Sequence, residues 1–120
     1  MPIVLKSRRE IELMRRAGQV ACEVLGQMRD AAKAGVLTIQ LDELARRSLE
    51  RAGATALSKN YPTYKPGEGF PGYTCISVNE EVVHGVPGDR ELKDGDIVTL
   101  DLALSIDGYC ADTATTVSVG

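Results

Sequence analysis

Apolar residues recur every three or four positions in the first third of the chain, which is the pattern of an amphipathic helix. The stripe is formed by Ile11, Met14, Ala17, Ala21, Val24, Leu25, Met28 and Ala32. Ser7 and Glu10 stand before it at the spacing of a capping box, in which each side chain binds a backbone amide at the other position. With Gly35 as the C-terminal stop, the pattern predicts a helix over about 8–34.

A second, shorter helical stripe follows directly. Its apolar positions are Leu41, Leu44, Ala45 and Leu49. Thr38 is expected to cap its N-terminus, and Gly53 supplies the stop. We therefore predict a helix over about 38–52, and both helices need an apolar surface to pack against.

The pattern changes to alternation in the last quarter of the chain, around an Asp-Gly pair at 107–108. Asp-Gly between two alternating runs is a strong signal for a hairpin with a two-residue turn. Such a turn places Asp101 opposite Ala114 and Asp112 opposite Ala103. Both carboxylates then lie on one face as diagonal neighbours, with Cα atoms about 7–8 Å apart.

The other face of the first hairpin strand is an unbroken apolar row and must be the buried side. It holds Val98, Leu100, Leu102, Leu104 and Ile106. On the opposite face, two carboxylates about 4 Å apart would repel by about 4 kcal/mol at an effective dielectric near 20. The pair therefore invites a metal ion, a shared proton or open solvent, and solvated acids are a common alternative on strands.

Further strands are expected between the second helix and this hairpin, which gives a sheet over about 55–119. Thr55–Ser58 is a weak strand candidate, and the Pro- and Gly-rich stretch 61–72 is an irregular loop that either connects strands or lines a ligand. Residues 73–87 alternate again and are predicted to form a second hairpin. The only histidine, His84, falls at the end of its second strand, where imidazole can bind a substrate or carry a proton.

Length and composition fit one α+β domain over 1–120. The chain has a formal net charge of −3 with interspersed signs, which gives no basic face for nucleic acid and no helix for a membrane surface. No window is long and apolar enough for a membrane span or a signal peptide, so a cytoplasmic location is expected. Cys22, Cys75 and Cys110 are widely spaced in apolar surroundings and are expected to be reduced core thiols.

Several longer motifs resemble the N-terminal half of type I methionine aminopeptidases, which are metallopeptidases. They are Gly69-Phe-Pro-Gly72, Cys75-Ile-Ser-Val-Asn-Glu-Glu-Val-Val-His84-Gly-Val-Pro87, Lys93-Asp-Gly-Asp-Ile-Val98, and the hairpin that carries Asp101 and Asp112. The resemblance covers essentially all 120 residues. It implies half of a pita-bread fold, in which two similar α+β halves enclose a dinuclear metal centre.

The resemblance also implies a role for each candidate site residue. Asp101 would be a bidentate ligand of one metal and Asp112 a ligand that bridges two, the metals being Co, Mn, Fe or Zn. His84 would bind the substrate and assist proton transfer, and Phe70 and Cys75 would line the pocket for an initiator methionine. The reaction implied is hydrolysis of the first peptide bond of a peptide.

The remaining ligands of the family, a histidine and two glutamates, have no counterpart in this sequence. Whether the chain is an enzyme by itself is left open, since two aspartates make a weak and open site. We expect a truncated half-domain that is inactive or very weak and forms a homodimer, because its sheet would otherwise expose an apolar patch and an unsatisfied edge. The alternatives are one piece of a split aminopeptidase that needs a separate C-terminal half, and a non-catalytic peptide-binding module.

Overall fold

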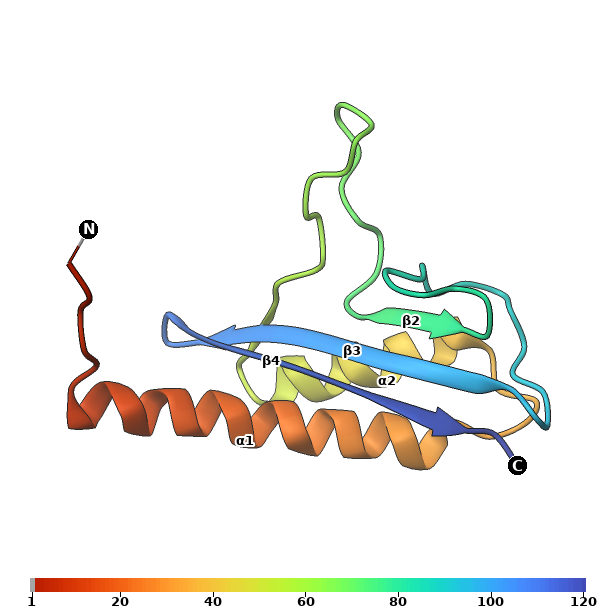
Figure 1. Ribbon diagram of the computed structural model, residues 1–120, viewed down its shortest axis with the longest axis horizontal. Helices are drawn as coiled ribbons and strands as arrows, with labels where there is room; N and C mark the ends of the chain where they lie inside the picture. The colour runs from red at the N-terminus through yellow and green to blue at the C-terminus, as the bar shows by residue number, and fades with distance from the viewer. Residues whose placement is uncertain (1) are drawn as a thin grey trace.

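Two helices cover one face of a four-stranded antiparallel sheet in the computed structural model, which describes residues 2–120 (Figure 1). The elements in chain order are α1 (Arg8–Ala31), α2 (Thr38–Arg51), β1 (Thr55–Ala56), β2 (Cys75–Val78), β3 (Ile97–Ile106) and β4 (Tyr109–Ser118). This arrangement is the predicted α+β class. Strand β3 is central, because β4 pairs along one of its edges while β1 and β2 share the other.

Helix α1 begins with the predicted capping box. The Glu10 amide donates to Ser7 Oγ at 3.2 Å, and the Ser7 amide donates to Glu10 Oε1 at 2.9 Å. The helix ends at Ala31, three residues before the expected end. Ile11 and Met14 are 45% and 40% exposed, because the first turns of α1 extend past the end of the sheet (Figure 1).

The cap of α2 differs from the prediction, because Leu37 and not Thr38 is the N-cap residue. Thr38 is the first helical residue, and its hydroxyl is engaged with the backbone of Gly88. Thr38 Oγ1 donates to the Gly88 carbonyl at 3.1 Å and accepts from the Gly88 amide at 2.9 Å. The Thr38 hydroxyl therefore binds a residue fifty positions away instead of capping its own helix. The Leu37 amide donates to the Gln40 side chain.

The β3–β4 hairpin has the predicted register. Asp101 pairs with Ala114 and Asp112 pairs with Ala103. The turn residues Asp107 and Gly108 have φ of +51° and +83°, which is the conformation of a two-residue type I′ turn.

The second predicted hairpin is wrong. Strand β2 pairs with β3, with Cys75 opposite Asp101, and residues 79–96 form a long loop. Asn79 and His84 have positive φ values of 53° and 58°, which interrupt an extended strand. The returning segment makes one backbone hydrogen bond to β2, from the Ile76 amide to the Gly85 carbonyl at 3.0 Å.

The core lies between the helices and one face of the sheet. The predicted apolar row of β3, from Val98 to Ile106, is at most 6% exposed. It packs against the inner stripe of both helices, formed by Ala17, Val20, Ala21, Val24, Leu25, Met28, Leu41, Ala45 and Leu49. In the part of the chain that the structure describes, no helix is both long and apolar enough to cross a membrane.

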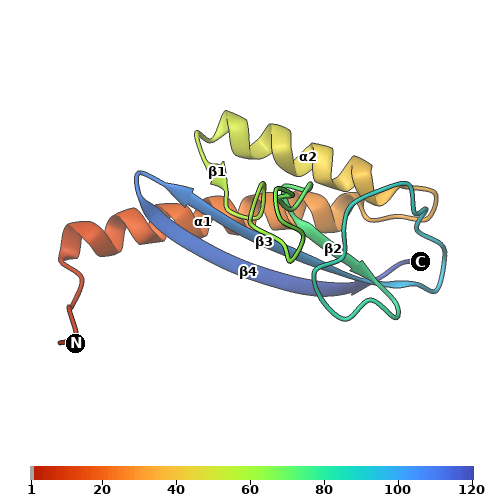
Figure 2. The same cartoon turned by 90° about the horizontal axis from the view of Figure 1, so that it is seen from above.

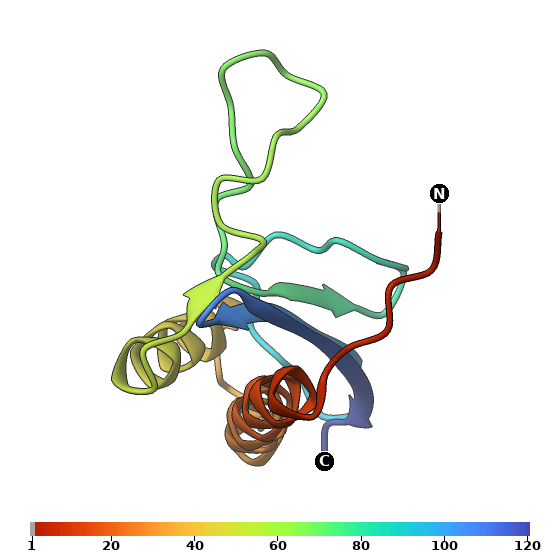
Figure 3. The same cartoon turned by 90° about the vertical axis from the view of Figure 1, so that its left-hand side faces the viewer.

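Within residues 2–120, no helix covers the opposite face of the sheet, which we call the open face (Figures 2 and 3). It consists of the outward residues of β3 and β4 and the matching positions of β2. These are small or polar: Cys75, Ser77, Thr99, Asp101, Ala103, Ser105, Cys110, Asp112, Ala114, Thr116 and Ser118. The expected apolar patch is therefore absent from these positions, and Ile97, 51% exposed, is the large apolar residue at the end of this row.

Candidate metal centre and its surroundings

Asp101 and Asp112 project from the open face as diagonal neighbours. Their partners in the ladder, Ala114 and Ala103, fix this relation. One step along the same face, the hydroxyls of Thr99 and Thr116 lie 2.8 Å apart, which shows directly that alternate side chains of the two strands meet there. Asp101 is partly buried at the centre of the sheet and Asp112 is exposed on the outer strand.

The environment of Asp101 disfavours its ionised form. Burial raises the pKa of the Asp101 carboxyl above its ordinary value, and the neighbouring Asp112 carboxylate raises it further. The charge of His84 acts in the opposite direction and lowers that pKa. A half-buried carboxylate with a like-charged neighbour is stabilised by a cation or a proton.

Cys75 lies beside Asp101, as its direct partner on β2. The thiol is buried, and burial is the main cause that raises its pKa, with Asp101 adding to the effect and the Ser58 hydroxyl opposing it. A thiol with a raised pKa is poorly nucleophilic, which suits a lining residue. Cys22 and Cys110, expected in the core, are exposed, because they lie on the outer side of α1 and on the open face of β4.

His84 is exposed in the loop after β2, and not at the end of a strand as predicted. Cys75, Asp101 and Asp112 thus share the open face on β2, β3 and β4, and His84 lies in the loop that joins β2 to β3.

The loop between β1 and β2 protrudes on the side of the open face (Figure 3), and Phe70 belongs to this loop. Backbone hydrogen bonds tie it to its neighbours across the loop, from the Asn60 amide to the Phe70 carbonyl and from the Phe70 amide to the Tyr61 carbonyl, both at 2.8 Å. Phe70 is partly buried, whereas Tyr61 and Tyr64 are 68% and 91% exposed. Of these three aromatic residues, Phe70 is the one shielded enough to line a pocket.

Asp42 supports this site and was not singled out from the sequence. The carboxylate is 3% exposed and accepts from the Thr74 hydroxyl at 2.7 Å, the Thr74 amide at 2.8 Å and the Tyr73 amide at 3.1 Å. These bonds fix the chain just before Cys75. The sequence signal that could have identified Asp42 is its position next to Leu41 on the apolar side of α2, because an unpaired charge is costly there.

Most of the chain, residues 12–120, matches the model of metallopeptidase family M24. The chain therefore belongs to this family, as its motifs predicted. Within the family it is similar to methionine aminopeptidases and corresponds to their N-terminal half. It is 42% identical to the methionine aminopeptidase of Clostridium perfringens and 41% identical to methionine aminopeptidase 1 of Bacillus subtilis, in each case over 98% of this chain and 45% of the relative.

Solved structures give the same result. The methionine aminopeptidase of Rickettsia prowazekii superimposes with a TM-score of 0.90 at 34% identity, over 99% of this chain and 46% of that one. The enzyme of Thermotoga maritima gives 0.89 at 32% identity, with the same coverage. These likenesses confirm the half pita-bread fold. The chain spans about half the length of the relatives it matches.

Membership of a metallopeptidase family implies use of a divalent metal. The two open-face carboxylates have the oxygen donors that suit such an ion. Among residues 2–120, no group of three or more His, Cys, Asp or Glu side chains is placed to hold a metal. The residues therefore fit part of a metal centre.

Proposed function

We propose that this chain forms the N-terminal half of a dinuclear-metal methionine aminopeptidase, which removes the initiator methionine from peptides. The observation that carries the proposal is the shared face of Asp101 and Asp112, fixed by the β3–β4 register. By the family resemblance these are two of five ligands, and a histidine and two glutamates supply the rest. The cytoplasmic location expected from the sequence belongs to the same proposal.

Each candidate residue has a part in this chemistry. When bound, the divalent metals supply Lewis-acid activation of the peptide carbonyl and of water. Asp101 and Asp112 hold them, and His84 accepts or donates a proton at the substrate. Cys75 and Phe70 line the pocket for the methionine side chain, where a neutral thiol and an aromatic ring provide an apolar surface.

Metal binding is tested by calorimetric titration with Mn²⁺ and Co²⁺. The wild-type chain should bind weakly, and Asp101→Asn or Asp112→Asn should lower the affinity by at least about 10-fold. Asp107→Asn is the matched control, since it removes a carboxylate from the turn of the same hairpin, where asparagine tolerates the positive φ. Equal binding by all four proteins would contradict the assignment of the ligands.

Activity is expected to need more ligands than residues 1–120 provide. We therefore expect little or no release of methionine from a short peptide by this chain with Mn²⁺ or Co²⁺. Addition of a separate chain with the second half of a methionine aminopeptidase should produce activity, as in the split-enzyme alternative. Peptide binding without metal binding or activity would instead favour a non-catalytic module.

We also propose that the chain forms a homodimer. The outer edge of β4 has no partner strand among residues 2–120, and a long free edge is a template for pairing with another chain. Pairing of two β4 edges about a twofold axis would extend the sheet and place the open faces of both copies on one side. The aspartates of each copy would then complete a site that one copy provides only in part.

A further inference from the structure

His84 has a backbone conformation that side-chain-bearing residues rarely adopt. Its φ is +58°, in the left-handed region, where Cβ crowds the following carbonyl. Such a residue persists where its surroundings determine the conformation, and this arrangement is typical of functional sites. The contacts that hold His84 are therefore of interest.

The contacts that hold this conformation are made by the next residue, Gly85. The Gly85 amide donates to the Ser77 hydroxyl at 3.0 Å, and the Gly85 carbonyl accepts from the Ile76 amide at 3.0 Å. The backbone of Gly85 packs so closely on β2 that an added Cβ would overlap the Ile76 carbonyl oxygen. Ser77 is 3% exposed, so its hydroxyl accepts this bond where water hardly competes for it.

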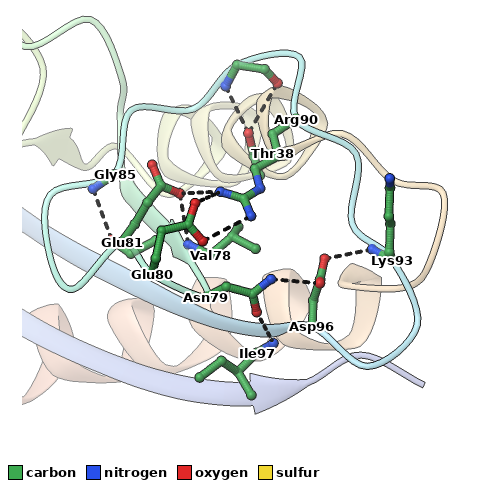
Figure 4. A network of polar contacts seen from close by, with 12 residues as sticks. Thr38, Val78, Asn79, Glu80, Glu81, Gly85, Arg90, Lys93, Asp96 and Ile97 are labelled. Carbon is green, nitrogen blue, oxygen red and sulfur yellow. Dashed lines mark hydrogen bonds and ion pairs between the residues drawn. The ribbon is translucent and has the colours of Figure 1, made fainter.

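The rest of the loop is tied down on both sides of His84 (Figure 4). Before it, Glu81 Oε1 accepts from the Val78 amide at 3.0 Å and from Arg90 at 3.5 Å, and Arg90 also binds Glu80 at 3.0 Å. After it, Gly88 is held by the hydroxyl of Thr38. These anchors, together with the bond between Gly85 and Ser77, therefore restrict the backbone at His84.

We infer that Ser77 is a positioning residue for His84. By accepting from the Gly85 amide it holds the left-handed backbone conformation that sets the direction of the His84 side chain. Loss of the hydroxyl leaves this amide without a partner and lets His84 relax toward an ordinary backbone conformation. The catalytic meaning of this position rests on the proposed function, whereas the positioning itself does not.

The test is NMR spectroscopy of the metal-free chain, where the single histidine gives unambiguous ring signals. Ser77→Ala should move the His84 ring resonances toward their values in an unstructured peptide and speed hydrogen exchange of the Gly85 amide. Ser77→Thr keeps a hydroxyl and should restore both. Thr99→Ala is the matched control. Thr99 is the direct partner of Ser77 on β3, and this substitution removes one hydroxyl contact, with Thr116, on the same face.

Unchanged His84 signals in Ser77→Ala, or an equal change in Thr99→Ala, would overturn the inference. Fast exchange of the Gly85 amide in the wild-type chain would overturn it even if the alanine variant does not fold. In the assembled two-chain enzyme, Ser77→Ala should lower kcat on the order of 10- to 100-fold with little change in KM. The NMR result stands without that activity, so failure of the proposed function and failure of this inference are distinguishable.

Discussion

At the scale of single residues, Asp42 shows how one buried charge fixes a site that it does not touch. It accepts from two backbone amides and one hydroxyl at positions 73–74, and Cys75 follows immediately. Asp42→Ala leaves two buried donors and one partly buried donor without their acceptor, so we expect a loss of about 3 kcal/mol in the free energy of unfolding. Urea denaturation of the metal-free chain measures this loss.

Two further variants test the cause. Asp42→Asn keeps one acceptor oxygen and should cost less than alanine. Asp30→Ala removes an exposed helical aspartate, 75% accessible, and should change the stability by about 0.5 kcal/mol or less. Similar losses in Asp42→Ala and Asp30→Ala would mean that the buried bonds contribute little.

The relative position of the candidate ligands was predictable at this scale, because the placement of Asp101 and Asp112 follows from local rules. Alternation and a two-residue turn fix which residues face each other, and the register agrees. Asp42, Ser77 and the Thr38–Gly88 contact were not predictable in this way. Each binds backbone groups at least eight positions away, and such partners are determined only once the chain has folded.

At the scale of elements, the start of α1 is joined to the β3–β4 turn. Tyr109 donates to Glu10 Oε2 at 3.0 Å, and the same carboxylate completes the capping box with Ser7. The backbone bond from Ser7 and then the Tyr109 bond lower the pKa of Glu10 below its ordinary value. One side chain therefore stabilises both the helix terminus and its contact with the hairpin.

This shift predicts a dependence of stability on acid pH. Because the pKa of Glu10 is lowered in the folded chain, the stabilisation is complete above the ordinary glutamate pKa and is lost as pH falls through the lowered value. Glu10→Gln should therefore be less stable at neutral pH and show a smaller loss on acidification. Thermal unfolding between neutral and acid pH measures both effects.

The control is Glu12→Gln on the same helix, where the carboxylate pairs with Arg15 at the surface at 3.5 Å. It should leave the acid profile nearly as in the wild type, since exposed ion pairs contribute little. An acid profile of Glu10→Gln identical to that of the wild type would show that the tie to Tyr109 and Ser7 is not energetically significant.

The two predicted hairpins show which elements a sequence determines. The Asp107-Gly108 hairpin formed because turn chemistry and alternation agree. The alternating segment from 82 to 86 did not form a strand, because positive φ at His84 and close packing of Gly85 on β2 fix an irregular path. The side chains of Val82 and Val83 are 82% and 62% exposed as a result.

At the scale of the whole molecule, the hydrogen-bond pattern of the hairpin decides what the free edge of β4 presents. The turn closes on Ile106 and Tyr109, so odd-numbered residues of β4 bond to β3. The Ala103 carbonyl, opposite Asp112, is bound by the Leu57 amide on the other edge of β3, which agrees with this alternation. The amides of even-numbered residues such as Ala114 therefore point outward from the sheet.

This pattern gives a selective test of the proposed homodimer. Proline at an outward position removes an edge donor without removing a bond to β3, and edge strands tolerate it. We expect the wild-type chain to be a dimer at micromolar concentration and Ala114→Pro to be a folded monomer, as measured by size-exclusion chromatography with light scattering. Thr115→Pro removes a β3 bond and should instead lower the stability of the fold.

The Ala114→Pro variant also links assembly to metal binding. If the second copy completes the site, Ala114→Pro should weaken Mn²⁺ binding although it leaves Asp101 and Asp112 in place. If the dimer forms elsewhere, Ala114→Pro remains dimeric and the β4 edge is not the interface. A wild-type chain that is monomeric at micromolar concentration would contradict self-association altogether, and the partner would then have to be a different chain that carries the remaining ligands.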